Sequence, residues 1–213
     1  MKLYFSRNYN PRLAVATARY LGVPVEFEFA SPFDPVHIDH FRALNPNHRI
    51  PILLEDDGTA LWEADAIACR LSQLAGSAFW RIGAMEPRML QWLSWANGDF
   101  VAGCDKVHFE RVTRQRYSHG PIRTHYVEDG LALFHRSAAI LDAHLANQDW
   151  LLEDGISYAD FRAACVLPFA DIAGLPVADY PNITAWLARL SAIEAWNDPF
   201  AGLEAPALPA PAI

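Results

Sequence analysis

The stretch from residue 45 to residue 75 constrains the fold of this chain more than any other. Two short apolar runs, residues 52–55 and 59–62, flank the dipeptide Asp57-Gly58, and this combination is a strong signal for a β-hairpin. From Glu63 onward, apolar residues recur with the i, i+3, i+4, i+7 spacing of a helix. The stretch therefore predicts a loop, a strand, a tight turn, a second strand and a helix.

The N-terminal segment predicts a βαβ unit. Residues 2–5 and 25–29 alternate between polar and apolar side chains, as strands do. The dipeptide Asn10-Pro11 is typical of a helix start, with asparagine at the N-cap and proline at the first helical position. A further helix is expected over residues 35–44. The order βαβαββα is that of a thioredoxin-like domain.

Pro51 stands at the start of the first hairpin strand, where its missing N–H does least harm. Only about 5% of X–Pro bonds in folded proteins are cis, so the residue alone favours an ordinary edge proline. However, the order Arg-Ile-Pro-Ile-Leu, a hairpin, and then Glu-Ala-x-Ala-Ile resembles the glutathione-binding half of the glutathione S-transferase family. That resemblance implies a cis Ile50–Pro51 bond, with the backbone N–H and C=O of Ile50 facing glutathione.

Ser157 and Asp160 stand three residues apart before an apolar run, which predicts a capping box at a helix start. The segment looks like the motif that begins the central helix of the transferase family's C-terminal domain, and its role is structural. The resemblance thus covers about residues 1–200 and implies a thioredoxin-like α/β domain followed by an all-helical bundle, the GST fold. The expected division is a glutathione-binding domain over 1–77, a linker over 78–86, a helical domain over 87–200 and an Ala/Pro-rich tail over 201–213.

Composition places the chain among packed globular proteins, since 52% of its 213 residues are hydrophobic and 20% are charged. The net charge of −8 argues against general nucleic-acid binding, which needs a basic face. The apolar runs are far shorter than a membrane span of about 20 residues, so we expect a cytoplasmic protein that does not insert into a membrane. Cys69, Cys104 and Cys165 are far apart, which favours reduced thiols, and the scattered histidines predict no metal site.

A glutathione transferase must ionise the glutathione thiol, because the thiolate is the nucleophile. The N–H groups and partial positive charge of the first helix start favour an anion nearby. The resemblance puts Asn10 at the position of the bacterial cysteine-type residue, with Ser6, Asn8 and Tyr9 close in sequence. An asparagine amide can donate to a thiolate but cannot form a mixed disulfide. Asn10 is therefore either an N-cap alone or an N-cap that also contacts the thiolate.

Glu63 opens the helix after the hairpin, where the helix dipole stabilises any carboxylate. One interpretation is that Glu63 is simply a solvent-exposed charge at the helix start. The resemblance instead implies that Glu63 binds the α-ammonium group of glutathione. Ala64 departs from the family, which usually has serine or threonine here to bind the γ-glutamyl carboxylate. His48 and Arg49 precede the proline and are candidates for binding the glycyl carboxylate, although Arg49 also fits a simple surface charge.

The resemblance also implies an electrophile pocket on the long helix after residue 87, with Phe100, Gly103, Cys104 and Val107 as its candidate lining. The expected protein is a homodimeric transferase in which the glutathione thiolate attacks a small apolar electrophile. Two alternatives remain open because of Asn10 and Ala64. One is a glutathione-dependent disulfide or peroxide reductase, and the other is a non-catalytic scaffold that keeps the fold.

Overall fold

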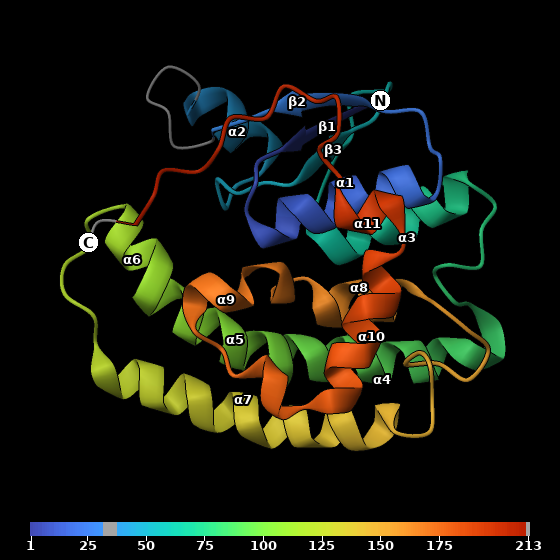
Figure 1. Cartoon of the computed structure of the whole chain (residues 1–213). Coiled ribbons are helices and arrows are strands. Elements are labelled where there is room, and N and C mark those ends of the chain that lie inside the picture. Colours follow the sequence, from blue (N-terminus) through green and yellow to red (C-terminus); the bar gives the residue numbers. More distant parts are fainter. Residues whose placement is uncertain (32–37, 212–213) are drawn as a thin grey trace. The chain divides into compact units, whose positions relative to one another are not determined.

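The computed structural model describes residues 1–31 and 38–211, which form two compact units (Figure 1). The first unit comprises residues 1–80 and 192–207, and the second comprises residues 81–191 and the chain from 208 on. The segment 192–207 therefore returns to the first unit. The sequence analysis had assigned residues up to 200 to the helical domain and the rest to a tail.

A four-stranded sheet with the order β2-β1-β3-β4 forms the centre of the first unit. β1 and β2 are parallel, while β3 pairs antiparallel with both β1 and β4. The predicted βαβαββα order is confirmed; of the helix expected over residues 35–44, the part before Ile38 lies outside the described residues. The elements are β1 Lys2–Phe5, α1 Tyr9–Tyr20, β2 Glu26–Phe29, α2 Ile38–Leu44, β3 Ile52–Leu54, β4 Ala60–Trp62, α3 Ala64–Leu74 and, near the C-terminus, α11 Glu194–Asn197.

Alternation along β1 gives the sheet two apolar faces. Leu3 and Phe5 point to one face, where side chains of α1 and α3 bury them completely or almost so. Tyr4 points to the other face and packs with Phe41 of α2. Phe200, which follows α11, stacks on Phe5 with 5.7 Å between the ring centroids, and this contact explains why the C-terminal segment belongs to the first unit.

The described part of the second unit consists of helices and their connections. A long helical stretch begins at Glu86 and contains two π-helical turns, one of which includes Gly98, and such turns often mark functional or strained positions. Its elements are α4 Glu86–Trp95, a π turn Ala96–Phe100, α5 Val101–His108, a second π turn Phe109–Thr113 and α6 Arg114–Arg116; α7 Thr124–Leu145, α8 Tyr158–Ala164, α9 Ala170–Ala173 and α10 Pro181–Ser191 follow.

The start of α8 carries the predicted capping box. The Ser157 hydroxyl accepts from the Ala159 N–H at 3.2 Å, and the Asp160 carboxylate accepts from the Ser157 N–H at 2.9 Å. The same carboxylate accepts from the Leu151 N–H at 2.9 Å and from the Trp186 indole N–H at 3.1 Å. Burial raises the pKa of Asp160 to about 6, although these hydrogen bonds oppose the shift. Asp160 therefore ties together three segments of the helical unit.

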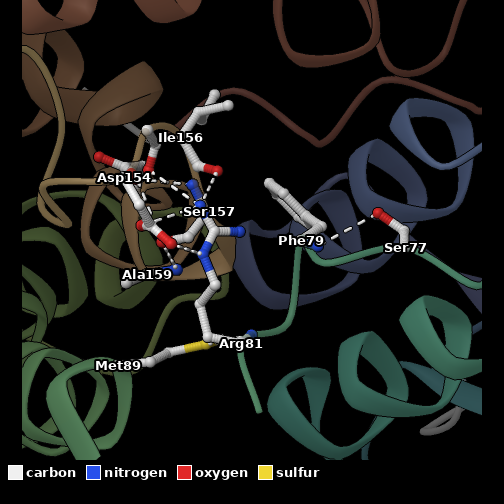
Figure 2. Close-up of polar contacts among 10 residues, drawn as sticks. Ser77, Phe79, Arg81, Met89, Asp154, Ile156, Ser157 and Ala159 are labelled. Carbon is white, nitrogen blue, oxygen red and sulfur yellow. Dashed lines mark hydrogen bonds and ion pairs between the residues drawn. The ribbon is translucent and has the colours of Figure 1, made fainter. Parts of the chain in front are cut away.

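Arg81 holds the loop that leads into this helix, as Figure 2 shows. Its Nε lies 2.9 Å from the Asp154 carboxylate, and its guanidinium also donates to the carbonyl oxygens of Gly155 and Ile156. Arg81 is buried, so this planar set of donors is largely shielded from water. The first residue of the second unit thus fixes the approach to Ser157.

Candidate functional site

Three loops of the first unit meet at one end of the strands β1, β3 and β4, here called the sheet edge, because of the strand register. Ile52 pairs with Tyr4 on one side and with Trp62 on the other, and both pairings are antiparallel. The residue before Ile52 and the residues after Tyr4 and Trp62 must therefore lie at the same edge. This places Pro51, Glu63 and the β1–α1 loop together, as the glutathione hypothesis requires.

The proline loop is ordered by a side chain that the sequence analysis overlooked. The amide of buried Asn45 donates to the Arg49 carbonyl at 2.8 Å and accepts from the Asn47 N–H at 2.9 Å. The peptide bond that follows, Ile50–Pro51, is cis, which confirms that prediction. An asparagine before proline commonly bonds to the backbone two residues on, and this turn chemistry was the available signal.

His48 and Arg49 lie in the same loop with different surroundings. The backbone of His48 has a φ of 52°, in the left-handed region. Its Nε2 lies 2.9 Å from Nε of Arg42, which in turn forms an ion pair with Asp39 at 3.2 Å. Arg49 is exposed at the surface of the loop. Both residues thus lie in the loop before Pro51, and Arg49 is the more exposed of the two.

Glu63 occupies an unusual backbone conformation immediately before α3. Its φ of 71° and ψ of 127° lie outside the regions that non-glycine residues normally adopt, at a cost of about 1–3 kcal/mol. Its side chain is exposed and makes no capping hydrogen bond to the helix. Backbone strain of this kind concentrates at ligand-binding positions. Ala64, the first residue of α3, is buried with 3% of its surface exposed.

The start of α1 differs from the prediction by two residues. The helix begins at Tyr9 with Asn8 as the N-cap residue, so Asn10 lies inside the first turn and the N-cap prediction for it is wrong. Asn8 adopts the extended conformation that an N-cap needs and directs its amide to the Ser6 hydroxyl at 3.3 Å. Pro11 remains compatible with the helix because the first-turn N–H groups have no partner within the helix. The first turn contains no acidic residue that would offset its partial positive charge.

Comparison with known proteins decides the family. Models of the glutathione S-transferase N-terminal domain and C-terminal domain match residues 12–74 and 124–189. The chain belongs to the glutathione S-transferase family. Both halves of the glutathione S-transferase fold are therefore present, in the order expected from the sequence.

Individual relatives of this transferase-family chain are distant. Elongation factor 1-gamma of Carassius auratus is 26% identical over 195 residues, which are 85% of this chain but 41% of that protein. The chain thus spans less than half the length of that curated relative. A glutathione S-transferase structure from Pseudomonas fluorescens is 25% identical with a TM-score of 0.76, and the match covers 92% of this chain and 96% of that one. Glutathione S-transferase I bound with lactoylglutathione has a TM-score of 0.83 at 18% identity, covering 94% and 98% of the two chains.

The candidates for an electrophile pocket lie in the interior of the helical unit. Phe100, Cys104 and Val107 have no exposed surface, and burial raises the pKa of the Cys104 thiol well above its ordinary value. A Cβ on Gly103 would lie 2.8 Å from the backbone nitrogen of Phe134, so this glycine permits close packing of α5 against α7. These four positions are packing residues, and this placement does not agree with the prediction that they line a pocket.

Other kinds of site can be compared with the described part of the chain. Within residues 1–31 and 38–211, no group of three or more His, Cys, Asp or Glu side chains is placed to hold a metal ion. The same residues include no helix that is both long and apolar enough to cross a membrane. Cys69, Cys104 and Cys165 form no disulfide bond within the described residues.

Proposed function

We propose that this protein binds glutathione at the sheet edge formed by Pro51, Glu63 and the start of α1. There the thiolate attacks a small apolar electrophile: a sulfur–carbon bond forms and the leaving group departs with its electron pair. The observation that carries the proposal is the convergence of the Pro51 loop, Glu63 with its positive φ, and the α1 start at one edge. Membership of the glutathione S-transferase family supports this choice of ligand.

Each end of glutathione has a proposed partner. The backbone N–H and C=O of Ile50 pair with the cysteinyl part, because a short extended segment can add hydrogen bonds as a strand does. The exposed carboxylate of Glu63 binds the α-ammonium group, and the first N–H groups of α3 bind the γ-glutamyl carboxylate. Arg49, with His48 beside it, meets the glycyl carboxylate.

The thiolate lies near the start of α1. The helix dipole and the first-turn N–H groups favour the ionised sulfur, and no acidic side chain in that turn opposes them. We place Asn10 in the role of an amide donor to the thiolate.

Two other functions keep specific support. A glutathione-dependent disulfide or peroxide reductase would use the same site, and Asn10 in place of a nucleophilic cysteine leaves the reaction type open. The similarity to elongation factor 1-gamma leaves a non-catalytic scaffold open. We further propose that the protein works as a cytoplasmic homodimer.

The test begins with retention of the protein on immobilised glutathione, which a scaffold without the site should not show. Initial rates are then compared for a chloronitrobenzene, which accepts the thiolate in a substitution, and for hydroxyethyl disulfide, which is reduced. The proposal predicts retention and a higher rate with the chloronitrobenzene. A higher rate with the disulfide supports the reductase, and absence of retention together with absence of both activities contradicts the proposal.

A further inference from the structure

The chain after α11 lies against the first unit and reaches the β1–α1 loop. Phe200 stacks on Phe5, and Leu203 and Ala205 pack against the same apolar core. The segment is rich in alanine and proline and has few large side chains of its own to bury. Its docking therefore combines these side-chain contacts with hydrogen bonds to its backbone.

Arg7 makes one of these contacts from within the β1–α1 loop. Its Nε donates to the Ala205 carbonyl at 2.7 Å, and its guanidinium carbon lies 4.8 Å from the centroid of the Phe200 ring. The side chain is half-buried, so both contacts are partly shielded from water. Arg7 thus joins the loop at the proposed site to the C-terminal segment.

Other hydrogen bonds of the loop run within it and to α1. The Ser6 hydroxyl accepts from the Asn8 backbone N–H at 3.4 Å and from its side-chain amide at 3.3 Å, and the Asn8 carbonyl accepts from the Arg12 N–H at 2.9 Å. The first turn of α1 has an anchor of its own, because buried Arg12 donates to the Trp196 carbonyl and lies over the Trp196 ring. The contact between Arg7 and Ala205 restrains the loop before that turn, because it ties the loop to a segment nearly two hundred residues away.

We propose that Arg7 is a positioning residue: held by the C-terminal segment, it fixes loop residues 6–8, including the N-cap residue Asn8, relative to the glutathione sulfur. This inference rests on the proposed function. Its physical basis is that stabilisation of an anion by a helix start falls off within the first turn, so a small displacement of the N-cap loop beside the sulfur weakens the effect on the thiolate. The C-terminal segment then affects the chemistry without touching the substrate.

Arg19 provides a matched control within the same helix. It also donates to a carbonyl of the C-terminal segment, that of Ala201, and its guanidinium lies 5.8 Å from the ring centroid of Phe27. Unlike Arg7, it lies in the last turn of α1, away from the sheet edge that holds the proposed site. Arg7→Ala and Arg19→Ala therefore each remove one cation, one bond to the C-terminal segment and one ring contact.

The test compares these two variants in the full-length chain. Arg7→Ala should raise the Michaelis constant for glutathione about two- to tenfold, the equivalent of one hydrogen bond, and should shift the pH profile of kcat/KM toward higher pH. Arg19→Ala should change the Michaelis constant by less than about twofold and leave the pH profile in place. Its loss in melting temperature should be similar to that of Arg7→Ala. Equal kinetic effects of the two variants, or an unchanged pH profile in Arg7→Ala, would overturn the inference while the proposed function stands.

A second readout does not depend on activity. Amide hydrogen exchange of residues 6–9 in glutathione-free protein should be faster in Arg7→Ala than in the wild type, and unchanged in Arg19→Ala. If exchange in this loop is the same in all three proteins, Arg7 does not position it. Failure of the wild type to bind glutathione would instead count against the proposed function, so the two failures are distinguishable.

Discussion

The starts of α8 and α3 are built in opposite ways. At α8, Ser157 has the extended backbone of a capping residue, and its side chain and that of Asp160 satisfy the first N–H groups while both are fully buried. At α3, Glu63 has a backbone with positive φ, an exposed side chain and no capping bond. Capping stabilises a helix by about 1 kcal/mol, and α3 does without this stabilisation and carries backbone strain as well.

We infer from this difference that the α8 start serves the fold, and we propose that the α3 start serves a ligand. The α8 start is closed, because its N–H groups and its carboxylate already satisfy one another inside the protein. The α3 start lies at the sheet edge beside Pro51, where an anionic group of a ligand can take the place of a cap. Substitutions at the first should change stability and spare binding, and substitutions at the second should do the reverse.

The largest effect is expected for Asp160→Ala. It removes the acceptor for the N–H groups of Ser157, Leu151 and Trp186 inside the helical unit, each worth about 1–3 kcal/mol when left unpaired. We expect the free energy of unfolding to fall by roughly 3 kcal/mol or more. Chemical denaturation measures this change. Glutathione affinity of the folded fraction should stay within about twofold of the wild type.

Two further measurements control that experiment. Asp160→Asn keeps one acceptor oxygen and should lose less stability, so the comparison remains possible if the alanine variant does not fold. Because the folded-state pKa of Asp160 is raised to about 6, its protonated form is favoured in the native state. The wild type should therefore lose stability as the pH rises from about 4 through about 6, and Asp160→Ala should lack this loss. If Asp160→Ala loses more glutathione binding than its unfolded fraction accounts for, the claim that the α8 start affects stability and spares binding is contradicted.

Glu63→Gln is expected to have the next largest effect, this time on binding. Loss of a charged hydrogen bond to the ligand ammonium should cost about 1.5–3 kcal/mol, or roughly ten- to a hundredfold in glutathione affinity. Titration calorimetry measures this, with Glu128→Gln on the exposed surface of α7 as the control for a lost negative charge. Unchanged affinity in Glu63→Gln would mean that Glu63 does not bind the ligand ammonium and is only an exposed charge at the start of α3.

Ala64→Ser adds the hydroxyl that the family usually has. It should tighten glutathione binding by roughly three- to thirtyfold, because the added hydroxyl can donate to the γ-glutamyl carboxylate. The gain is smaller than a full charged hydrogen bond, because water already supplies part of that bond in an open cleft. The catalytic constant at saturation should change little, since the contact lies away from the sulfur. Ala64 is almost fully buried, so unfolding must be measured alongside to show that the hydroxyl is accommodated. Flat affinity in a stable variant means that residue 64 does not face the γ-glutamyl group.

The smallest effect is expected at Asn10. Asn10→Ala should raise the pKa of the bound glutathione thiol by less than about one unit, and Asn10→Asp should raise it further through like-charge repulsion. Since Asn10 is inside the first turn, an aspartate there is compatible with the helix dipole and keeps α1 folded. The absorbance of the bound thiolate is followed against pH. Identical titrations in all three proteins would remove Asn10 from the chemistry.

The sequence sufficed for features that local chemistry determines. Asp57-Gly58 predicted the hairpin, and the Ser157–Asp160 spacing predicted the capping box, because each needs only neighbouring residues. The start of α1 was misplaced because asparagine stands at both positions 8 and 10, and Pro11 fits more than one place in the first turn. Gly103 was predicted to line a pocket, but its lack of a side chain lets α5 pack closely against α7. That contact depends on Phe134, which is distant in sequence. The roles of Asn45 and Arg7 likewise depend on contacts that no periodicity encodes.

The central claim is that glutathione binds at the open helix starts of the sheet edge and not at the closed start of α8. Titration of isotope-labelled protein with glutathione, followed through its amide resonances, tests this directly. The account predicts that the amides of residues 6–10, Ile50 and residues 63–65 shift together with one dissociation constant, while those of residues 157–160 stay in place. Shifts that avoid the sheet edge, or no shifts at all with millimolar glutathione, would contradict it.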